Sequence, residues 1–350
     1  MWYGVVKKRL GAGVPEVKIN NLSKFTPIFL GIGFWITSAA SAEAHGGIEP
    51  GQNLLLAWNT NPLPSLGLFL AAYIYINGLN RWSHPSHPIS QWQRISFFSG
   101  LIVIFLALQS PIDPLAEHQF SIHQVQHLLL RMIGPLLVLS GAPLTPMLRG
   151  APPWFLQVVI KPIVRVSVSH QIYGFITNPV LTTLVFIATI YLWQIPAVHD
   201  MAVRSDLVHS GMHSTMLISG FMFWWLVIDP KPHRSRLHFA LRILYLGLIV
   251  IPNTILGASI TFSSHLLYEA YQEFPQPLGL SPLIDQQLGG LILWVVGDMM
   301  SILAAGIVMI LWYKKEQEQT NASVLWTSRP LIASIIEDRR YGLPVIFFSR

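Results

Sequence analysis

Long apolar stretches alternate along this chain with short segments that hold most of the charged residues. A helix that crosses the hydrocarbon core of a bilayer needs about 20 mostly apolar residues, so each stretch predicts one transmembrane span. We therefore expect an all-α membrane protein, a bundle of about seven transmembrane helices in a lipid bilayer. The predicted spans are residues 62–79, 92–109, 121–140, 178–196, 208–229, 238–262 and 288–312.

The composition favours a membrane protein over a soluble one. Hydrophobic residues make up 52% and charged residues 11% of the 350 positions, whereas a soluble domain carries about 25% charged residues. The chain has no cysteine, which excludes thiolate metal sites, disulfides and CxxC redox chemistry. The net charge of +6 does not indicate nucleic-acid binding, because the basic residues lie mostly in short loops between apolar stretches.

The N-terminal segment is typical of a signal sequence. Residues 1–24 are rich in lysine and arginine, and the apolar run 25–38 leads to Ala42-Glu43-Ala44, which has the pattern of a cleavage site. We expect residues 1–44 to be a signal peptide or an uncleaved signal anchor, 45–312 the transmembrane domain and 313–350 a cytoplasmic tail without a clear fold. Cleavage would leave His45 at the N-terminus, where amine and imidazole could chelate copper; a histidine that merely follows a signal sequence is an equally good interpretation.

The charged residues predict an orientation. When the first apolar run enters from the inside, the inner loops hold the basic residues and the outer loops most of the acids, as the positive-inside rule requires. We therefore expect the N-terminus of the mature chain outside and the C-terminus in the cytoplasm. The inner basic residues include Arg81, Arg94, Arg149, Lys161, Lys231, Lys314 and Lys315, and the outer acids include Glu117, Asp200, Asp206, Glu273 and Asp285.

Two histidine pairs lie inside apolar stretches, His123 with His127 and His209 with His213. A separation of four residues is about one helical turn, so each pair lies on one helix face. Both spans are entered from the outer face, so the pairs should lie at matching depths. Imidazoles are costly in lipid unless they are paired or bound. The two pairs could therefore hold a metal ion or a haem iron; the alternative is a hydrogen-bonded network without a metal.

Other polar residues inside the spans have structural interpretations. Arg131 and Asp298 should lie at similar depths in their spans, and a lone charge there is costly, so we expect an ion pair between them. Trp224 and Trp225 fit an aromatic belt at the inner membrane surface. Asn253 could satisfy backbone groups that Pro252 leaves free. The stretch 151–170 is predicted to be an interfacial segment.

Four stretches of the chain carry a further signal. The first covers residues 114–129 and 134–143, the second 195–200, 209–213 and 220–225, the third 257–262 with 267–268, and the fourth 285–290 with Trp294. In these stretches the chain resembles the CtaG family of polytopic cytochrome c oxidase assembly factors. The family's histidine pattern is matched at His123, His127, His199, His209 and His213, while Gln124 stands where the family often has methionine, and the chain lacks the acid that the family often has near Thr215.

The resemblance implies seven membrane helices and a role in maturing a haem–copper oxidase. The implied partners are cytochrome c oxidase subunits, and the implied location is the plasma (inner) membrane of a bacterium. Imidazole and thioether ligands without a carboxylate cage suit copper better than magnesium, calcium or manganese. Our leading hypothesis is a non-enzymatic assembly factor that binds or delivers copper at the outer face. The candidate metal ligands are His123, His127, His209 and His213, followed by His199, Met212 and Met216.

Other roles are conceivable for single residues and for the whole protein. Asp200 could orient an imidazole as a carboxylate behind the ligands. A membrane b-type cytochrome with bis-histidine haem is the main alternative, although such haem sites use one histidine per helix. A copper or proton transporter is the other alternative. No nucleophile–base pair indicates an enzyme. For the methionines, core packing is the commoner role.

Overall fold

The computed structural model describes residues 57–340 apart from 60, 83–87, 163–173, 176 and 229–236, and for 321–340 it describes the backbone only. These residues form helices and no strand, which confirms the predicted all-α class. The signal-like segment and His45 lie outside the described residues. So do His84, His87, His170 and His233.

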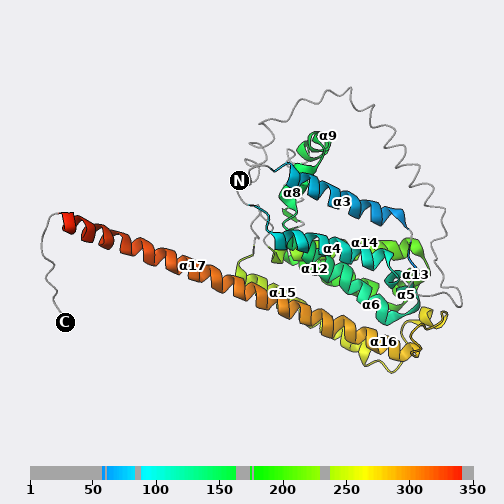
Figure 1. The fold of residues 1–350 in the computed structure, drawn as a ribbon. Coiled ribbons are helices and arrows are strands. Elements are labelled where there is room, and N and C mark those ends of the chain that lie inside the picture. The colour runs from blue at the N-terminus through cyan, green and yellow to red at the C-terminus, as the bar shows by residue number, and fades with distance from the viewer. Residues whose placement is uncertain are drawn as a thin grey trace.

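The helices pack into one bundle from which a single long helix projects (Figure 1). The first half contains α3 (Pro62–Asn80), α4 (Gln91–Gln109), α5 (Ile112–His118), α6 (Phe120–Leu128), η3 (Leu129–Ile133), α7 (Gly134–Ser140), α8 (Leu144–Gly150), α9 (Pro153–Phe155) and η4 (Leu156–Ile160). The second half contains α12 (Pro179–Trp193), α13 (Pro196–Val203), α14 (Asp206–Val227), α15 (Phe239–Thr261), η5 (Glu269–Gln272), α16 (Pro282–Leu291), η6 (Ile292–Val296) and α17 (Gly297–Arg340).

Five helical segments of the described chain are long and apolar enough to cross a membrane, and a sixth span results if α12 and α13 count as one. The five are Pro62–Asn80, Gln91–Gln109, Phe120–Ser140, Phe239–Thr261 and Pro282–Thr320. The predicted count of seven is therefore not confirmed. The span predicted at 208–229 corresponds to α14, which has 22 residues but is made less apolar by its histidines and serines. The span predicted at 178–196 corresponds to α12, which meets α13 at a bend of 72°.

The third span is interrupted by a π-helical turn. Pro135 has no N–H, so it cannot donate to the carbonyl of Arg131 four residues earlier. The backbone responds with η3, in which the N–H of Gly134 donates to the carbonyl of Leu129. Gly220 of α14 packs against the carbonyl oxygen of Arg131, and a Cβ at this glycine would collide with it. The proline and the glycine together bring the third span and α14 into close contact.

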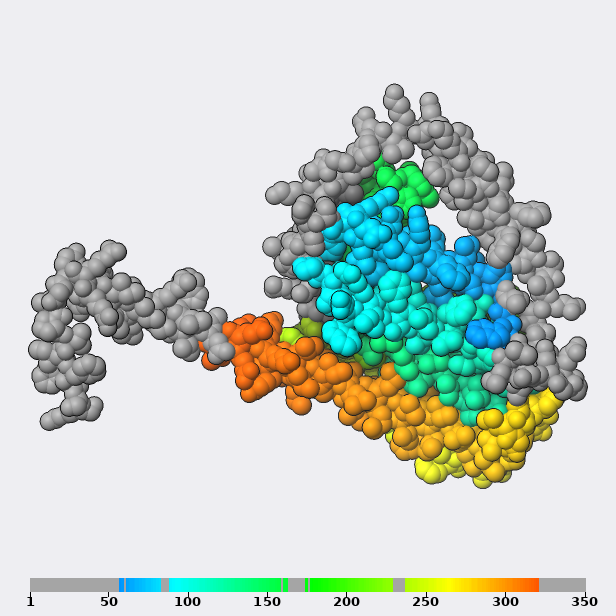
Figure 2. All heavy atoms as spheres, in the orientation of Figure 1, coloured from blue at the N-terminus to red at the C-terminus, as the bar shows by residue number. Residues whose placement is uncertain are grey.

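The described C-terminal chain is more regular than we predicted. Residues 313–340, expected to lack a clear fold, continue α17 as helix, and the space-filling view shows α17 leaving the packed bundle (Figure 2). The run from Lys314 to Gln319 consists of lysine, glutamate and glutamine, which all have high helix propensity. An existing helix therefore extends beyond the apolar part at little cost.

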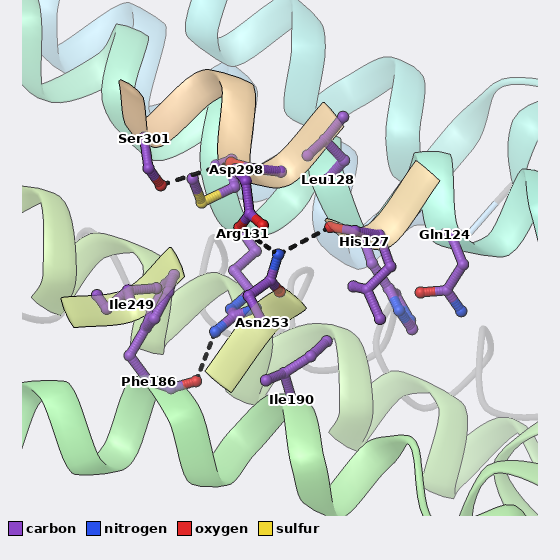
Figure 3. Close-up of a pocket in the computed structure, with 13 residues that line it drawn as sticks. Gln124, His127, Leu128, Arg131, Phe186, Ile190, Ile249, Asn253, Asp298 and Ser301 are labelled. Atoms are coloured by element: carbon purple, nitrogen blue, oxygen red, sulfur yellow. Dashed lines mark hydrogen bonds between the residues drawn. The ribbon is translucent and has the colours of Figure 1, made fainter. Parts of the chain in front are cut away.

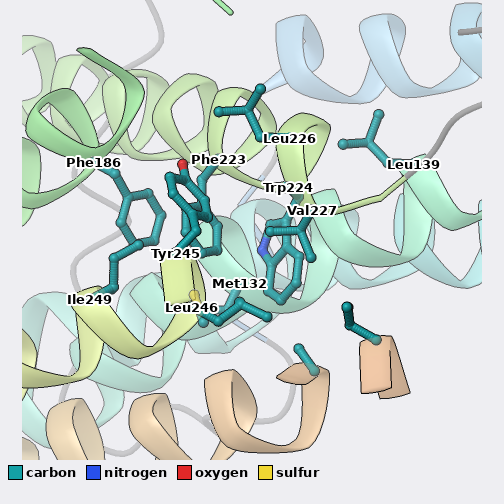
Figure 4. Close-up of a cluster of buried hydrophobic side chains, with 12 residues drawn as sticks. Met132, Leu139, Phe186, Phe223, Trp224, Leu226, Val227, Tyr245, Leu246 and Ile249 are labelled. Carbon is teal, nitrogen blue, oxygen red and sulfur yellow. The ribbon is translucent and has the colours of Figure 1, made fainter. Parts of the chain in front are cut away.

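Trp224 lies in the core and not in an aromatic belt, so that part of the prediction is wrong. The indole is fully buried in a cluster with Phe223, Tyr245 and Leu246 (Figure 4). Phe186 stacks on Phe223 at a centroid distance of 4.3 Å. This cluster joins α12, α14 and α15 at the end of the bundle away from the histidine pairs. Trp225 packs against it and is partly buried.

Candidate metal centre

The two histidine pairs face each other across the contact between α6 and α14. Within each pair the rings lie one turn apart and are tilted toward each other, with centroid distances of 4.4 Å for His123–His127 and 4.2 Å for His209–His213. Between the helices, the ring of His123 lies 5.2 Å from that of His209 and 5.8 Å from that of His213. The ring of His127 lies 5.9 Å from that of His213. The structure thus brings together the four histidines of the two pairs that the sequence singled out.

Three of these histidines have the proximity that a shared metal ion requires. One ring nitrogen each of His123, His209 and His213 lies within 4.8 Å of the other two. A metal with 2.0–2.1 Å bonds to nitrogen needs its ligand atoms about 3–4 Å apart, so small side-chain rotations would suffice. The ring nitrogens of His127, and Nε2 of His123 and His213, are buried without a hydrogen-bond partner. Lone pairs buried in this way are what a metal ion would use.

A chain of hydrogen bonds determines which nitrogen of His123 carries its hydrogen. Nδ1 of His199 lies 2.9 Å from the carbonyl oxygen of Trp193, which can only accept, so this nitrogen is the N–H of a neutral His199 ring. The Tyr271 hydroxyl lies 2.9 Å from Nε2 of His199 and 2.7 Å from Nδ1 of His123. It therefore donates to His199 and accepts from His123. The remaining nitrogen of His123, Nε2, keeps a lone pair directed into the cluster.

Tyr271 is a residue that the sequence analysis did not single out. It lies on η5, more than 140 positions from His123, and no local pattern connects the two. Burial raises the pKa of its phenol well above the usual value, so the hydroxyl keeps the hydrogen that it donates. Arg204 pairs with Glu273 at 2.8 Å, which ties the segment carrying Tyr271 to the end of α13, the helix carrying His199. The feature of the sequence that could have indicated this role is the presence of two tyrosines, Tyr268 and Tyr271, in this loop.

Buried polar contacts from other helices hold α6 in place. The carboxylate of Asp285 on α16 accepts hydrogen bonds from the backbone N–H groups of Phe120 and Ser121, at 2.7 and 3.2 Å. These two groups begin α6 and have no partner within the helix. Gln126 donates from Nε2 to the carbonyl of Ala107 and to the carboxylate of Asp113, at 2.7 and 2.6 Å. The position of the His123–His127 face therefore depends on α4, α5 and α16.

Glu117 lies at the edge of the cluster, with Oε1 3.9 Å from Nδ1 of His209. Burial, followed by repulsion from Asp113 and Asp206, raises the pKa of its carboxyl to about 8. Glu117 is therefore largely protonated at neutral pH and adds little negative charge to the cluster. The sequence predicted this glutamate only as an outer acid, because its place beside His209 results from the packing of α5 on the bundle.

Asp200 does not orient an imidazole, so that prediction is wrong. Its Oδ2 accepts from the backbone N–H of Ala270 at 3.3 Å and lies 4.0 Å from Nη1 of Arg204. The role of orienting an imidazole, which we had predicted for Asp200, belongs to Tyr271. Met212 and Met216 are fully buried in an apolar cluster with Phe120, Ile190 and Tyr268.

The predicted ion pair between Arg131 and Asp298 is not formed. Arg131 donates from Nη2 to the carbonyl of Phe186 at 2.6 Å, and its guanidinium lies 3.5 Å from the centroid of the Phe186 ring. Asp298 accepts from Nδ2 of Asn253 at 2.9 Å and from the Thr254 hydroxyl at 2.6 Å. Both charges thus have neutral partners, although both side chains line one cavity (Figure 3). Asn253 also donates to the carbonyl of Leu293, in η6.

The fold and the site together define a multi-pass membrane protein with a buried cluster of histidines between two of its helices. The profile of the family "Cytochrome c oxidase caa3 assembly factor (Caa3_CtaG)" matches residues 71–315. The chain belongs to this family, as the resemblance in its four stretches implied.

Curated relatives are distant. An uncharacterized protein of Mycobacterium leprae is 22% identical over 271 residues, and one of Mycobacterium bovis is 25% identical over 279 residues. An uncharacterized protein of Mycobacterium tuberculosis has the same identity over the same length as that of M. bovis. The matches cover 74–75% of this chain but only 40% of each relative. No solved structure matches the chain.

Proposed function

We propose that this protein assembles a haem–copper cytochrome c oxidase by holding a copper ion for an oxidase subunit at the outer face of a bacterial plasma membrane. The observation that carries the proposal is the buried group formed by His123, His209 and His213, whose ring nitrogens lie within 4.8 Å of one another. His127 completes the set from the next turn of α6. His199 acts through Tyr271, because both of its ring nitrogens are already hydrogen-bonded.

The charges around the cluster favour a monovalent ion. The proposed ligands are neutral imidazoles, and the cationic side chain of Arg131 lies one turn below His127. The cost of moving an ion out of water rises with the square of its charge, and an anionic neighbour would lower it. Imidazole binds both zinc and copper, but Zn²⁺ and Cu²⁺ would bear the larger cost at these uncharged ligands. The environment therefore favours Cu⁺ as the cargo.

The position of the cluster is compatible with transfer to a partner. His209 and His213 are each 7% exposed, whereas His123 is fully buried. The exchange route would therefore pass the α14 pair and Glu117. A haem fits less well, since the rings of His123 and His209 touch nearly edge to face at 5.2 Å and a macrocycle would need a layer of its own between the helices.

The decisive experiment measures copper per chain in the purified full-length protein after expression with copper. We expect close to one copper per chain in the wild type and almost none in His123→Ala/His213→Ala. His265→Ala is the matched control, because this histidine is exposed and lies away from the cluster, and it should keep its copper. Oxidase assembly is read in the same strains from the absorption of the mature enzyme. Copper retained by the double variant, or a Soret band in the wild type, would contradict the proposal.

A further inference from the structure

A cavity of about 20 Å³ lies directly beneath the histidine cluster, between η3, α12, α15 and α17. His127 lines it on the side of the histidine cluster, and Arg131, Asn253, Asp298 and Ser301 contribute further polar atoms (Figure 3). Met132 is among its apolar lining residues. A cavity needs a volume of roughly 10–15 Å³ to hold one water molecule. The cavity is therefore large enough for about one.

Two of the polar side chains that line the cavity lack hydrogen bonds that they need. Nε of Arg131 has no partner, although the side chain is more than nine-tenths buried. Both ring nitrogens of His127 also lack a partner, and this residue is 2% exposed. Asp298 accepts one hydrogen bond at each carboxylate oxygen, which leaves further lone pairs. Buried polar groups in proteins almost always find a partner, in many cases an ordered water.

We propose that this cavity is a water-binding site that connects His127 to Arg131 and Asp298. A water molecule here accepts from Nε–H of Arg131 and from a ring N–H of His127, and it donates a hydrogen to the carboxylate of Asp298. Buried waters typically make about three hydrogen bonds, and this arrangement supplies three. A small anion would be repelled by Asp298, and an apolar occupant would leave the guanidinium unsatisfied.

The bound water has a consequence for the histidine cluster. It orients the His127 ring from below, as Tyr271 orients that of His123 from the side. It also links the third span to α17 through a polar contact at a depth where the neighbouring side chains are mostly apolar. The site does not depend on the proposed copper ion, and its test uses metal-free protein.

Radiolytic labelling tests the proposal in full-length, metal-free protein in lipid nanodiscs. Brief X-ray exposure in H₂¹⁸O produces hydroxyl radicals from bound water, and these oxidise the side chains next to it. Met132 should take up ¹⁸O several-fold faster than Met216. Met212 and Met216 are the matched controls, because they are fully buried in an apolar cluster. Labelling of Met132 at the rate of Met216 would overturn the proposal.

A variant that fills the cavity distinguishes labelling by the bound water from labelling by bulk solvent. Ser301→Leu places a larger apolar side chain in the cavity, and it should reduce the labelling of Met132 to that of Met216. Ser259→Leu is its control, since Ser259 lies exposed on α15 and this variant should label like the wild type. Unchanged labelling of Met132 in Ser301→Leu would overturn the proposal. If Ser301→Leu does not fold, the wild-type comparison of the methionines decides alone.

Discussion

At the scale of the residue, a single hydroxyl group controls the chemistry of the proposed metal site. Tyr271 accepts from His123 and donates to His199, and the carbonyl of Trp193 determines the direction of the whole chain of hydrogen bonds. Partners behind a ligand fix its tautomer and orientation and raise its basicity. The histidines alone would provide nitrogens but not a defined lone pair on His123.

Replacement of this tyrosine tests its role as a positioning residue. We expect Tyr271→Phe to weaken Cu⁺ binding by roughly 10–100-fold, the range usual for such partners, because Nδ1 of His123 loses its acceptor while the aromatic packing remains. Competition with a Cu⁺-specific chelator measures the affinity. Tyr268→Phe is the control, since the Tyr268 hydroxyl donates to Gln194 and not to a histidine. Equal affinities of the two variants would show that the hydroxyl of Tyr271 has only a structural role.

At the scale of the element, the close contact of the third span with α14 depends on one missing side chain. A Cβ at Gly220 would lie 3.1 Å from the Cα of Arg131 and closer still to its carbonyl oxygen. The obstacle is backbone, which cannot move aside as a flexible side chain could. The distance between the two helices, and with it the gap between the histidine pairs, is therefore determined at this glycine.

Two alanine substitutions in α14 should have opposite effects. Gly220→Ala should destabilise the protein by roughly 1–3 kcal/mol, as overpacking does, and should lower its copper content. Gly211→Ala has nothing within 4 Å of the new Cβ and should be neutral or stabilise α14 by up to about 1 kcal/mol, because alanine is the better helix former. Thermal unfolding in nanodiscs measures both. A Gly220→Ala protein as stable as the wild type would mean that the helices can separate freely.

The start of α6 is capped by a residue from another helix. Asp285→Ala should lower stability by about 0.5–2 kcal/mol, because the N–H groups of Phe120 and Ser121 lose their acceptor. Asp285→Asn should cost less, since one amide oxygen can still accept. Ser281→Ala is the control: Ser281 caps its own helix α16 through Ile284, so its loss should leave copper affinity unchanged. If Asp285→Ala bound copper as the wild type does, the cap would not position the histidines.

At the scale of the whole molecule, the absence of cysteine makes the orientation directly testable. Leu278→Cys lies on an exposed loop and Glu318→Cys on the exposed part of α17. With the C-terminus in the cytoplasm, a membrane-impermeant maleimide should label Leu278→Cys in intact cells and Glu318→Cys only after permeabilisation. The unmodified chain, which has no thiol, is the blank. The reverse labelling pattern would place the histidine cluster on the cytoplasmic side and contradict the proposed delivery to an outer site.

Much of this protein follows from the sequence because it depends on properties of single segments. Apolar length predicted spans at 62–79 and 92–109, and α3 and α4 have nearly these bounds. The four-residue spacing placed His123 above His127, and His209 above His213, on their helices. Such features are local: a run of apolar side chains meets lipid, and a helical period fixes a face, whatever the rest of the chain does.

What the tertiary structure alone decided involves contacts between distant segments. Tyr271 accepts a hydrogen bond from His123, and the carboxylate of Asp285 caps α6. Arg131 donates to the carbonyl of Phe186, although pairing of opposite charges had predicted Asp298 as its partner. For His123 and Arg131 the sequence identified a group that needs a partner but could not choose among those available. That choice depends on helix distances and rotations, which arise from backbone approach at positions such as Gly220 and from the summed packing of many side chains.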